Sequence, residues 1–373
     1  MIKILFLIPN LGHGGAERVL VNLVNHMDKS KYDITVQTMF DVGIYRDKLA
    51  AHVKYKGGFP WYFRGNTIVY KLFSPRFLFK RHVKEHYDII VSYLEGPSAR
   101  VVSGCNDNTV KLVCWIHGEQ HTIKYLSSVF RNENEALNSY RKFHRIACVA
   151  ETVKDDFSSL VPLEAPIEVI YNCVETDVIR AKKSEAIDDV LFSKDVVNIC
   201  SVAKLMKIKG YDRLVNIQRK LKDEGIPTHV YIIGKGEELE PLTAQVRENG
   251  LEQDWTFVGF RDNPYKYVAA CDLYVCSSRR EGFSTAVTES LIVGTPVVST
   301  DCSGARELLG ENNEYGIVTG NDENALYSGL KRMLTEDGLL AHYKKQAEIR
   351  GMQFQIDQTV QQAEKMFEEV LSK

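Results

Sequence analysis

The sequence lacks any apolar run near the roughly 20 residues that a membrane-spanning helix needs, and it lacks a large excess of charge of either sign. Its formal net charge is −2 over 373 residues, which argues against nucleic-acid binding by the whole surface. The short apolar start, residues 1–10, has no cleavage signature and resembles a first β-strand rather than a signal peptide. These absences predict a cytoplasmic protein with no nucleic-acid partner.

Paired cysteines are also missing. The eight cysteines are scattered, and none shows the Cys-x-x-Cys spacing of many metal and redox sites. Several stand in apolar segments, such as Cys114 in LVCWI and Cys200 in NICSV, so we expect buried, reduced thiols rather than a disulfide framework. No Asp-x-Asp triplet occurs either. We therefore predict that the protein has no metal site.

The length and composition are those of a globular protein with more than one domain. A chain of 373 residues exceeds the usual size of a single hydrophobic core, which predicts two domains. A content of 44% hydrophobic and 26% charged residues argues against disordered and fibrous classes. Residues 1–175 carry 22 Lys and Arg against 18 Asp and Glu, whereas residues 176–373 carry 25 against 31. We expect the two halves to face different partners.

Strand-like and helix-like segments alternate along almost the whole chain, which favours parallel sheets with helices on both faces. The first series has strands predicted in residues 2–9, 33–40, 88–94, 111–117, 145–150 and 167–172. A second series has strands predicted in residues 197–205, 228–236, 255–260, 273–278, 295–301 and 316–320. Residues 175–195 are polar and weakly patterned, and we interpret them as a linker.

This organisation predicts two tandem, Rossmann-like, doubly wound α/β domains at residues 1–175 and 190–353. The amphipathic segment 354–373 is expected to form a helix that packs back on the first domain. Ligands of such sheets bind beyond the carboxyl ends of the strands, and two facing domains would enclose a cleft. We expect the functional site in that cleft.

Three glycines follow the first predicted strand and open a helix. Gly12, Gly14 and Gly15 would let a phosphate or a carbohydrate approach backbone N–H groups at the positive helix end. The dinucleotide fingerprint Gly-x-Gly-x-x-Gly fails here because Glu17 occupies the third glycine position. A tight turn without a ligand is the alternative interpretation.

Residues 59–84 combine six Lys and Arg with eight aromatic residues and contain no acid. Basic side chains attract anionic lipid headgroups, and aromatic rings settle at the membrane interface. The segment therefore favours peripheral contact with a membrane surface, at the inner face of the membrane. A helix with aromatic residues in the core and solvated basic residues is the alternative.

Several motifs resemble those of glycosyltransferase family 4. EGFSTAVTE matches the family's Glu-x7-Glu motif, with Glu281 and Glu289 at its ends. SVAKLMKIKGYDRL, YIIGKGEE and FVGFRDN are similar to its lysine-glycine loop, its next strand and turn, and the loop that borders the nucleotide base. GGAER, WIHGE and VIYNCVET are similar to elements of its first domain, so the resemblance covers nearly the whole chain. The implied architecture is the glycosyltransferase-B fold.

The resemblance implies a nucleotide-sugar donor site around the two glutamates. Glu281 would accept hydrogen bonds from donor-sugar hydroxyls and Glu289 from the ribose, because carboxylates form strong charge-assisted bonds with hydroxyl pairs. The diphosphate would lie at the start of the helix between them. The further donor-binding candidates are Gly14, Gly15, Phe260, Gly282, Phe283, Ser284 and Thr285. The alternative is that Glu281 is a helix-start charge and Glu289 a solvated residue.

Two lysines and a histidine complete the implied catalytic set. Lys204 and Lys209 would stabilise the departing nucleoside diphosphate without a metal ion. Lys209 matches the family directly, whereas Lys204 replaces the usual arginine and supplies a point charge instead of a bidentate fork. His117 ends a predicted strand and would contact the donor sugar or the acceptor, with Glu119 and His121 as substitutes. Solvated lysines and a structural histidine are the competing interpretations.

The resemblance thus implies a retaining, metal-independent, hexosyltransferase-type glycosyltransferase without a cofactor, acting in cell-surface polysaccharide synthesis. Its co-substrate would be a nucleotide sugar, expected to be a UDP-sugar, and its acceptor a glycan or a lipid-linked glycan. Cys173 and Ala305 depart from the family's pattern at the hinge and near the acceptor side. Two alternatives stay open: a sugar-nucleotide epimerase of similar architecture, and a nucleotide-sugar-binding protein without turnover.

Overall fold

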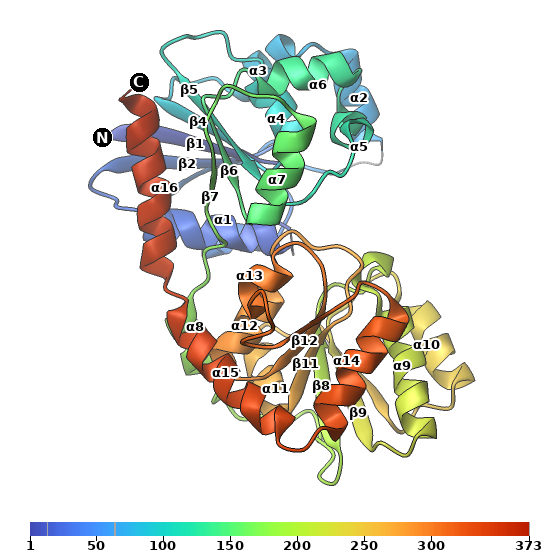
Figure 1. Cartoon of the computed structure of the whole chain (residues 1–373). Helices are drawn as coiled ribbons and strands as arrows, with labels where there is room; N and C mark the ends of the chain where they lie inside the picture. The colour runs from blue at the N-terminus through green and yellow to red at the C-terminus, as the bar shows by residue number, and fades with distance from the viewer. Residues whose placement is uncertain (13, 63–64, 373) are drawn as a thin grey trace. The chain divides into compact units, whose positions relative to one another are not determined.

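The computed structural model describes residues 1–12, 14–62 and 65–372, which form two compact α/β units (Figure 1). The first unit comprises Met1–Val174 and Ile356–Lys373, and the second comprises Glu175–Gln355. Each unit has one parallel sheet with helices on both of its faces. The predicted α/β class with two Rossmann-like domains is confirmed.

The first unit contains a seven-stranded parallel sheet in the order β3-β2-β1-β4-β5-β6-β7. Its strands are β1 Ile2–Ile8, β2 Tyr32–Thr38, β3 Lys54–Lys56, β4 Ile89–Tyr93, β5 Lys111–Ile116, β6 Arg145–Cys148 and β7 Ile167–Val169. Its α-helices are α1 Gly15–His26, α2 Asn66–Leu72, α3 Pro75–His82, α4 Pro97–Val102, α5 Ile123–Leu126, α6 Glu133–Tyr140, α7 Glu151–Leu160 and α16 Ile356–Leu371. Short 3-10 helices are η1 Tyr45–Lys48 and η2 Ser127–Val129.

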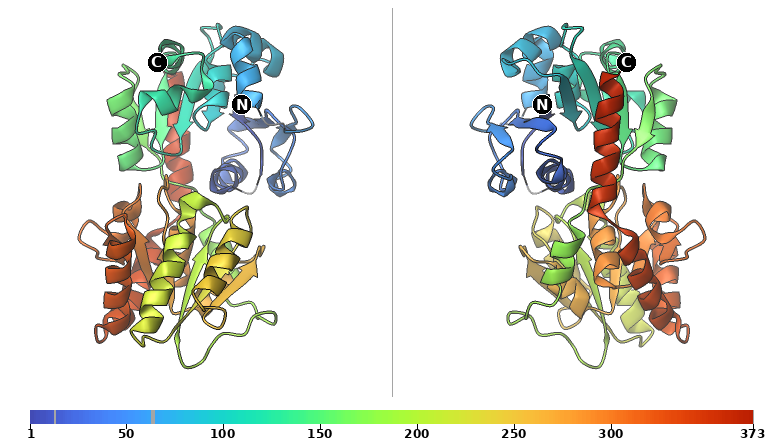
Figure 2. Two further views of the ribbon diagram at one scale, coloured as in Figure 1. Left: turned by 90° about the vertical axis from the view of Figure 1, so that its right-hand side faces the viewer. Right: turned by 90° about the vertical axis from the view of Figure 1, so that its left-hand side faces the viewer.

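The C-terminal helix α16 packs on the first sheet, although it follows the second unit in the chain (Figure 2). The Phe367 ring of α16 contacts Phe6 of the central strand β1, with the ring centroids 5.9 Å apart. The Asp28 backbone N–H donates to Glu364 Oε1 at 2.7 Å. Because strands of a parallel sheet are buried on both faces, they need apolar cover on each side, and α16 supplies part of it.

The second unit contains a six-stranded parallel sheet in the order β10-β9-β8-β11-β12-β13. Its strands are β8 Val197–Val202, β9 Thr228–Ile233, β10 Trp255–Gly259, β11 Leu273–Cys276, β12 Val297–Thr300 and β13 Ile317–Thr319. Its helices are α8 Thr176–Lys182, η3 Lys207–Lys209, α9 Tyr211–Asp223, α10 Leu239–Glu248, α11 Tyr265–Ala270, α12 Thr285–Val293, α13 Ala305–Leu309, α14 Glu323–Thr335 and α15 Leu339–Gln353.

Residues 175–195, predicted as a linker, differ from that expectation because they belong to the second unit and contain helix α8. Ile179 of α8 is fully buried. Asn263 donates to the Lys182 carbonyl at 2.9 Å and to Glu185 at 2.8 Å. Contacts with distant residues therefore hold a segment whose own apolar pattern is weak.

Strand order fixes where each sheet offers a ligand site. In the first sheet the chain moves outward from β1 to β3 and then returns to the other side of β1 with β4. The second sheet repeats this with β8 and β11. At such a switch point the loops after the two neighbouring strands diverge, and they leave a crevice beyond the carboxyl ends. The loops after β1 and β4, and after β8 and β11, are therefore the candidate ligand-binding loops.

All eight cysteines are unpaired, seven of them buried, as predicted. In the described ranges, no three His, Cys, Asp or Glu side chains are arranged to hold a metal ion. None of the described helices is both long and apolar enough to cross a bilayer. Within the basic aromatic segment 59–84, Phe63 and Arg64 lie outside the described residues.

Candidate functional site

An ion pair joins the two loops that flank the switch point of the second sheet. Lys209 follows β8 and Glu281 follows β11, and Lys209 Nζ donates to both Glu281 oxygens at 2.7 and 2.8 Å. Their side chains are 22% and 15% exposed. Burial alone would lower the pKa of Lys209, but the Glu281 carboxylate outweighs burial and holds that pKa above its ordinary value. The ammonium is therefore charged in the folded protein.

Two serine hydroxyls and a close backbone approach support the pair. The Ser277 hydroxyl donates to the Lys209 carbonyl at 2.8 Å, and the Ser278 hydroxyl donates to Glu281 Oε1 at 2.5 Å. Gly210 has φ +68°, and a Cβ there would lie 2.1 Å from the Ser277 carbonyl oxygen. Only glycine allows this approach, so the Lys209-Gly210 sequence has a steric reason.

The buried Arg213 supports the same junction from helix α9. Its Nε donates to the Ser277 carbonyl at 2.8 Å, and its Nη2 donates to Asn321 Oδ1 at 2.9 Å. Arg213 thus ties the loop after β11 to the loop after β13. A preorganised site needs such support, because its charged groups must keep their positions when a ligand arrives.

The pair keeps binding capacity for a ligand. A lysine ammonium has three donors, and two of those of Lys209 reach Glu281. A carboxylate has about four acceptor positions, and Lys209 and Ser278 together use three of those on Glu281. One donor and one acceptor therefore remain side by side, an arrangement suited to a ligand that carries both a phosphate and a hydroxyl.

Lys204 also follows β8, but the structure gives it different surroundings from those of Lys209. Its side chain is exposed. Within residues 1–12, 14–62 and 65–372, no hydrogen bond or ion pair involves the Lys204 side chain. Its charge is therefore compensated by solvent alone and can turn to an anionic ligand.

Helix α12 begins at the same edge of the sheet, four residues after Glu281. Ser284 is its N-cap and accepts from the Val287 N–H at 3.3 Å, and Thr285 is its first residue. Gly282 and Phe283 form the half-buried turn before the cap. The first-turn N–H groups of a helix carry partial positive charge and bind anions. The predicted residues Gly282, Phe283, Ser284 and Thr285 thus lie together.

The loop after β12 borders this turn. Gly304 has φ +74°, and a Cβ there would lie 2.6 Å from the Phe283 ring. The neighbouring Ser303 hydroxyl is buried and has no hydrogen-bond partner in the described part of the chain. Buried hydroxyl groups are usually bonded, so an unsatisfied one near the start of α12 is a candidate ligand contact.

Glu289 lies one turn into α12 and is only 8% exposed. Among the described residues it is the only acidic side chain that is buried. The alternative interpretation of Glu289 as a solvated residue is therefore wrong. A buried carboxylate has to be hydrogen-bonded or paired, so the burial of Glu289 in α12 indicates a specific role.

An exposed aromatic ring stands further along the same edge. Phe260 follows β10, and the Lys235 ammonium lies 5.0 Å from its ring centroid. Lys235 itself belongs to the turn after β9, where its carbonyl accepts from the Leu205 N–H at 3.1 Å. An exposed ring beside a basic residue can stack on a planar base.

In the first unit, two aromatic side chains with unsatisfied polar atoms lie in contact at the carboxyl ends of β4 and β5. The rings of Tyr93 and His117 have centroids 4.7 Å apart. The Tyr93 hydroxyl and His117 Nε2 are both buried, with no partner in the described ranges. Burial lowers the pKa of His117 to about 3, so its imidazole is neutral. A ligand hydroxyl or a water would satisfy this pair.

The loop after β4 positions His117. Glu95 Oε2 accepts from the His117 backbone N–H at 2.9 Å. The preceding Leu94 has φ 111°, which is a strained backbone for a bulky residue, and such strain clusters at functional sites. The suggested substitutes have other contacts: His121 lies 3.7 Å from Glu119 and 3.7 Å from Asp156. The geometry thus favours His117 over Glu119 and His121.

The glycines after β1 lie at the other side of this switch point. Gly14 is the N-cap of α1 and Gly15 its first residue. A Cβ on Gly14 would lie 2.1 Å from Glu17 Oε2, so the Glu17 carboxylate lies against this glycine. A negative charge at this helix start disfavours a phosphate and favours a ligand that donates hydroxyl groups.

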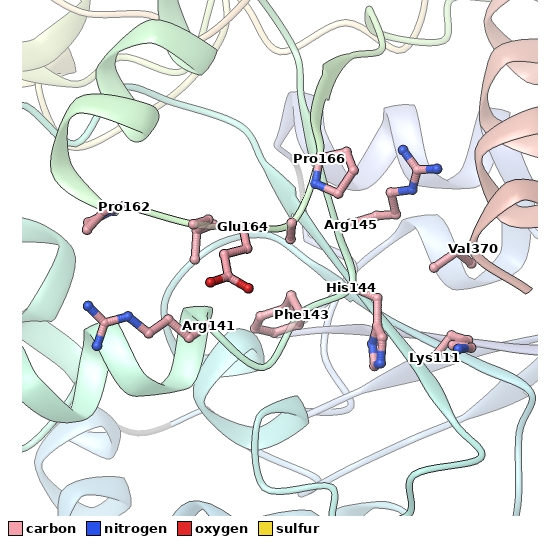
Figure 3. A pocket seen from close by; sticks show the side chains of 11 residues that line it. Lys111, Arg141, Phe143, His144, Arg145, Pro162, Glu164, Pro166 and Val370 are labelled. Carbon is pink, nitrogen blue, oxygen red and sulfur yellow. The ribbon is translucent and has the colours of Figure 1, made fainter. Parts of the chain in front are cut away.

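A separate cavity of about 850 Å³ lies in the first unit (Figure 3). It includes Lys111 and Arg145, the first residues of β5 and β6, and Pro166, which precedes β7. It is therefore at the amino ends of these strands, the edge opposite to His117. None of the predicted site residues lines it.

Sequence patterns do not reveal the residues that hold the site together. Tyr93, Ser278 and Arg213 were not predicted, although each contacts or supports a predicted residue. Arg213 had a detectable signal, because it is a charged residue on the apolar face of the segment YDRLVNIQRKL. Ser278 and Tyr93 are ordinary strand residues and had none.

Comparisons with known proteins agree with the fold and the motifs. The family model described as Glycosyltransferase Family 4 matches residues 13–178, and that described as Glycosyl transferases group 1 matches residues 182–350. A Campylobacter jejuni protein, N-acetylgalactosamine-N,N'-diacetylbacillosaminyl-diphospho-undecaprenol 4-alpha-N-acetylgalactosaminyltransferase, is 38% identical over 189 residues. That match covers 50% of this chain and 49% of the relative, so the chain spans about half of that enzyme's length.

Two further proteins match over nearly their full lengths. An uncharacterized glycosyltransferase of Haemophilus influenzae is 22% identical over 97% of this chain and 99% of its own. The structure of Anabaena Alr3699/HepE in complex with UDP-glucose has a TM-score of 0.76 at 19% identity, covering 99% of this chain and all of that one. At this identity the structural likeness shows the fold alone. The two units are the Rossmann-like domains of the glycosyltransferase-B type, and the chain belongs to glycosyltransferase family 4.

Proposed function

We propose that this protein is a retaining, metal-independent hexosyltransferase that moves a sugar from a UDP-sugar to a hydroxyl of a glycan or lipid-linked acceptor. The observation that carries the proposal is the Lys209–Glu281 ion pair at the switch point of the second sheet. It combines a cation for a diphosphate with an acceptor for a sugar hydroxyl, four residues before a helix start.

The donor would bind along the carboxyl edge of the second sheet. Its diphosphate would contact Lys209, Lys204 and the first N–H groups of α12, where positive charge is concentrated. Its sugar hydroxyls would donate to Glu281 and its ribose hydroxyls to Glu289. Phe260 would stack on the base. The Anabaena protein, whose structure contains UDP-glucose, supports a UDP-sugar as the donor.

In the transfer step, the bond between the anomeric carbon and the diphosphate oxygen breaks while the acceptor hydroxyl attacks from the same face. The electron pair of the broken bond stays on the diphosphate, and the acceptor's proton passes to the leaving oxygen. Lys209 and Lys204 stabilise the charge that develops there, so no metal ion is required. Same-face attack retains the anomeric configuration.

The acceptor would contact the first unit near His117. Its imidazole is neutral at physiological pH, because burial lowers the pKa to about 3, so Nε2 can exchange a hydrogen bond with a hydroxyl. Tyr93 could hold a bridging water. The name of the Campylobacter relative includes a diphospho-undecaprenol, which supports a lipid-linked glycan as the acceptor and cell-surface polysaccharide synthesis as the setting.

The test has two stages. First, UDP-sugars and other nucleotide sugars are screened by thermal shift, since a ligand at 100 times its dissociation constant stabilises the fold by about 2.7 kcal/mol. Second, each stabilising donor is incubated with diphospho-undecaprenol-linked glycans, and products are followed by mass spectrometry. Transfer that persists in EDTA supports metal independence. An NMR coupling constant that shows the same anomeric configuration in donor and product supports retention.

An arm without acceptor separates the alternatives. A new sugar isomer formed without acceptor supports an epimerase and contradicts the transferase. A donor that stabilises the protein but is never consumed, with any acceptor class, supports a binding protein without turnover. Release of UDP that depends on the acceptor supports the transferase.

A further inference from the structure

Exposed apolar side chains concentrate on one part of the first unit. Of the 19 large apolar side chains that are exposed in the described ranges, eight lie between residues 59 and 77. Single exposed apolar residues need no explanation, but a contiguous group marks an interaction site. We name the group formed by Trp61, Tyr62, Ile68, Leu72, Phe73 and Phe77 the α2–α3 surface.

Helix α2 presents its apolar face outward. Ile68 and Leu72 lie one turn apart and are 68% and 72% exposed. Tyr70, between them, is buried, and its hydroxyl is 2.9 Å from His82 Nε2 of α3. The tyrosine therefore supplies the inward anchor, and the aliphatic residues are left on the solvent side. Figures 1 and 2 show α2 and α3 on the outside of the first unit.

Two arginines fix this orientation by binding the last carbonyl groups of α2. The buried Arg100 donates to the carbonyls of Tyr70 at 2.6 Å and Phe73 at 2.8 Å. Arg131 donates to the carbonyl of Lys71 at 2.7 Å. Carbonyls at a helix end lack partners within the helix, so these bonds hold the helix in place. The exposure of Ile68 and Leu72 is thus built into the fold.

Uncompensated positive charge surrounds the apolar side chains. Segment 59–84 contains no acid, and no described residue forms an ion pair with any of its described cations, which are Lys71, Arg76, Lys80, Arg81 and Lys84. On α3, Phe77, Lys80 and Arg81 follow the i, i+3, i+4 spacing of one helix face. An apolar side chain and two cations therefore share a face.

We propose that the α2–α3 surface docks on a membrane that contains anionic lipids, with its aromatic and aliphatic side chains in the interface and its cations on the headgroups. Anionic headgroups complement cations that form no ion pair with any described residue, and the acyl boundary accepts the apolar side chains. A second copy of this chain is a poorer occupant. A two-fold contact would place the same positive surface against itself, and like charges repel.

This interaction goes beyond the proposed transfer reaction, because it requires neither donor nor acceptor. Its failure would leave the donor site untouched. The first measurement is sedimentation of the full chain with vesicles of phosphatidylcholine alone and of phosphatidylcholine with 30% phosphatidylglycerol. Binding is expected to the anionic vesicles, with at least about tenfold less to neutral ones, and it should weaken when salt screens the headgroups.

Charge variants test the cationic part. Lys71→Gln/Arg76→Gln/Lys80→Gln should lower the partition coefficient on the order of 100-fold, since each basic residue near an anionic surface contributes about fivefold. The matched control Lys29→Gln/Lys344→Gln/Lys345→Gln removes the same charge from three exposed lysines elsewhere. It should change binding by less than about threefold, because distant charges are screened.

Apolar variants test the other part. Ile68→Ser/Leu72→Ser should lower binding at least about tenfold without a change in the circular dichroism spectrum, because both side chains are exposed. Leu191→Ser/Met352→Ser, two exposed apolar residues of the second unit, is the control and should leave binding unchanged.

Trp61 offers a direct reporter of insertion. It is 66% exposed, whereas the other two tryptophans, Trp115 and Trp255, are 2% and 5% exposed. With anionic vesicles the tryptophan emission should move to shorter wavelength, brominated lipids should quench it, and Trp61→Phe should abolish both effects. If Trp61→Phe still sediments with the vesicles but shows no fluorescence shift or quenching, the fluorescence change comes from Trp61.

Three results would overturn the proposal. The first is an absence of binding to anionic vesicles at low salt. The second is an equal loss of binding in the charge variant and its lysine control. The third is a concentration-dependent dimer in sedimentation velocity that Ile68→Ser/Leu72→Ser converts to monomer while vesicle binding is absent, which would assign the surface to a second copy.

Discussion

Lys209 and Glu281 are 72 positions apart in the chain, yet Lys209 Nζ donates to both carboxylate oxygens, at 2.7 and 2.8 Å. The pair spans the loops after β8 and β11, which the strand order places side by side. In the proposed function each residue has two roles, one toward the ligand and one toward its partner, and substitutions at the two positions should have separable effects.

Lys209→Ala should lower kcat about 10²- to 10³-fold in the transfer assay, because it removes a cation from the charge that develops on the leaving diphosphate. Lys207→Ala is the control, since Lys207 is exposed and belongs to the same short helix, η3. Equal activity in both variants would exclude Lys209 from the reaction.

Glu281→Gln should destabilise the protein by about 1–3 kcal/mol in urea unfolding. Removing one partner of a buried pair costs about 3–5 kcal/mol, and the 22% exposure of Lys209 lets water compensate part of that cost. Glu252→Gln, at an exposed position, should stay within about 0.5 kcal/mol of the parent protein.

The contribution of this pair also has a defined pH dependence. The pKa of Lys209 is raised in the folded state above the ordinary value of 10.5. The resulting stabilisation is fully present below pH 10.5 and is lost as the pH rises through the folded-state pKa. The stability difference between the parent and Glu281→Gln should therefore be constant from pH 7 to 9 and shrink only above pH 10.5. A difference that shrinks on acidification to pH 6 contradicts this.

His117 should make the fold less stable in mild acid. Burial lowers its pKa from 6.5 to about 3, so between these values the unfolded state binds more protons than the folded state. Stability from this residue is complete above pH 6.5 and falls by about 2 kcal/mol by pH 5. In His117→Asn the free energy of unfolding should therefore fall by about 2 kcal/mol less by pH 5 than it does in the parent protein. The parent and the variant have to be compared because burial also lowers the pKa of His82, to about 4, so His82 contributes its own decline.

Gly210→Ala should destabilise the protein more than Gly225→Ala. Both glycines have positive φ, +68° and +71°, so an alanine costs about 1 kcal/mol at either position for the backbone alone. Only at Gly210 would the added Cβ meet another group, the Ser277 carbonyl oxygen at 2.1 Å, because nothing lies within 4 Å at Gly225. Equal unfolding midpoints for the two variants would show that the loops after β8 and β11 can separate freely.

The sequence was enough to predict the sheets, since strands of parallel sheets are nearly continuous apolar segments, such as Ile2–Ile8. It did not predict β3, Lys54–Lys56, because a three-residue strand is too short to show a pattern. Helix α8 was missed for another reason. Its position depends on contacts with residues far along the chain, such as the bond from Asn263 to the Lys182 carbonyl.

For the site, the motifs indicated Lys209, Glu281 and Glu289 but not how they are held. The bonds of Ser278 to Glu281 and of Arg213 to Ser277 depend on which strands are neighbours, and that order is a property of the whole sheet. The burial of Glu289 was more predictable, because five of the other eight residues of the helix are apolar. The orphan hydroxyl of Tyr93 has no signature in the sequence.

A crystal structure of the protein with a UDP-sugar that stabilises it in solution would locate the donor directly. We expect diphosphate oxygens within hydrogen-bond distance of Lys209 Nζ and of the first N–H groups of α12, with the ribose hydroxyls on Glu289. A nucleotide bound elsewhere, for example in the cavity of Figure 3, with Lys209 and Glu289 untouched, would contradict this expectation.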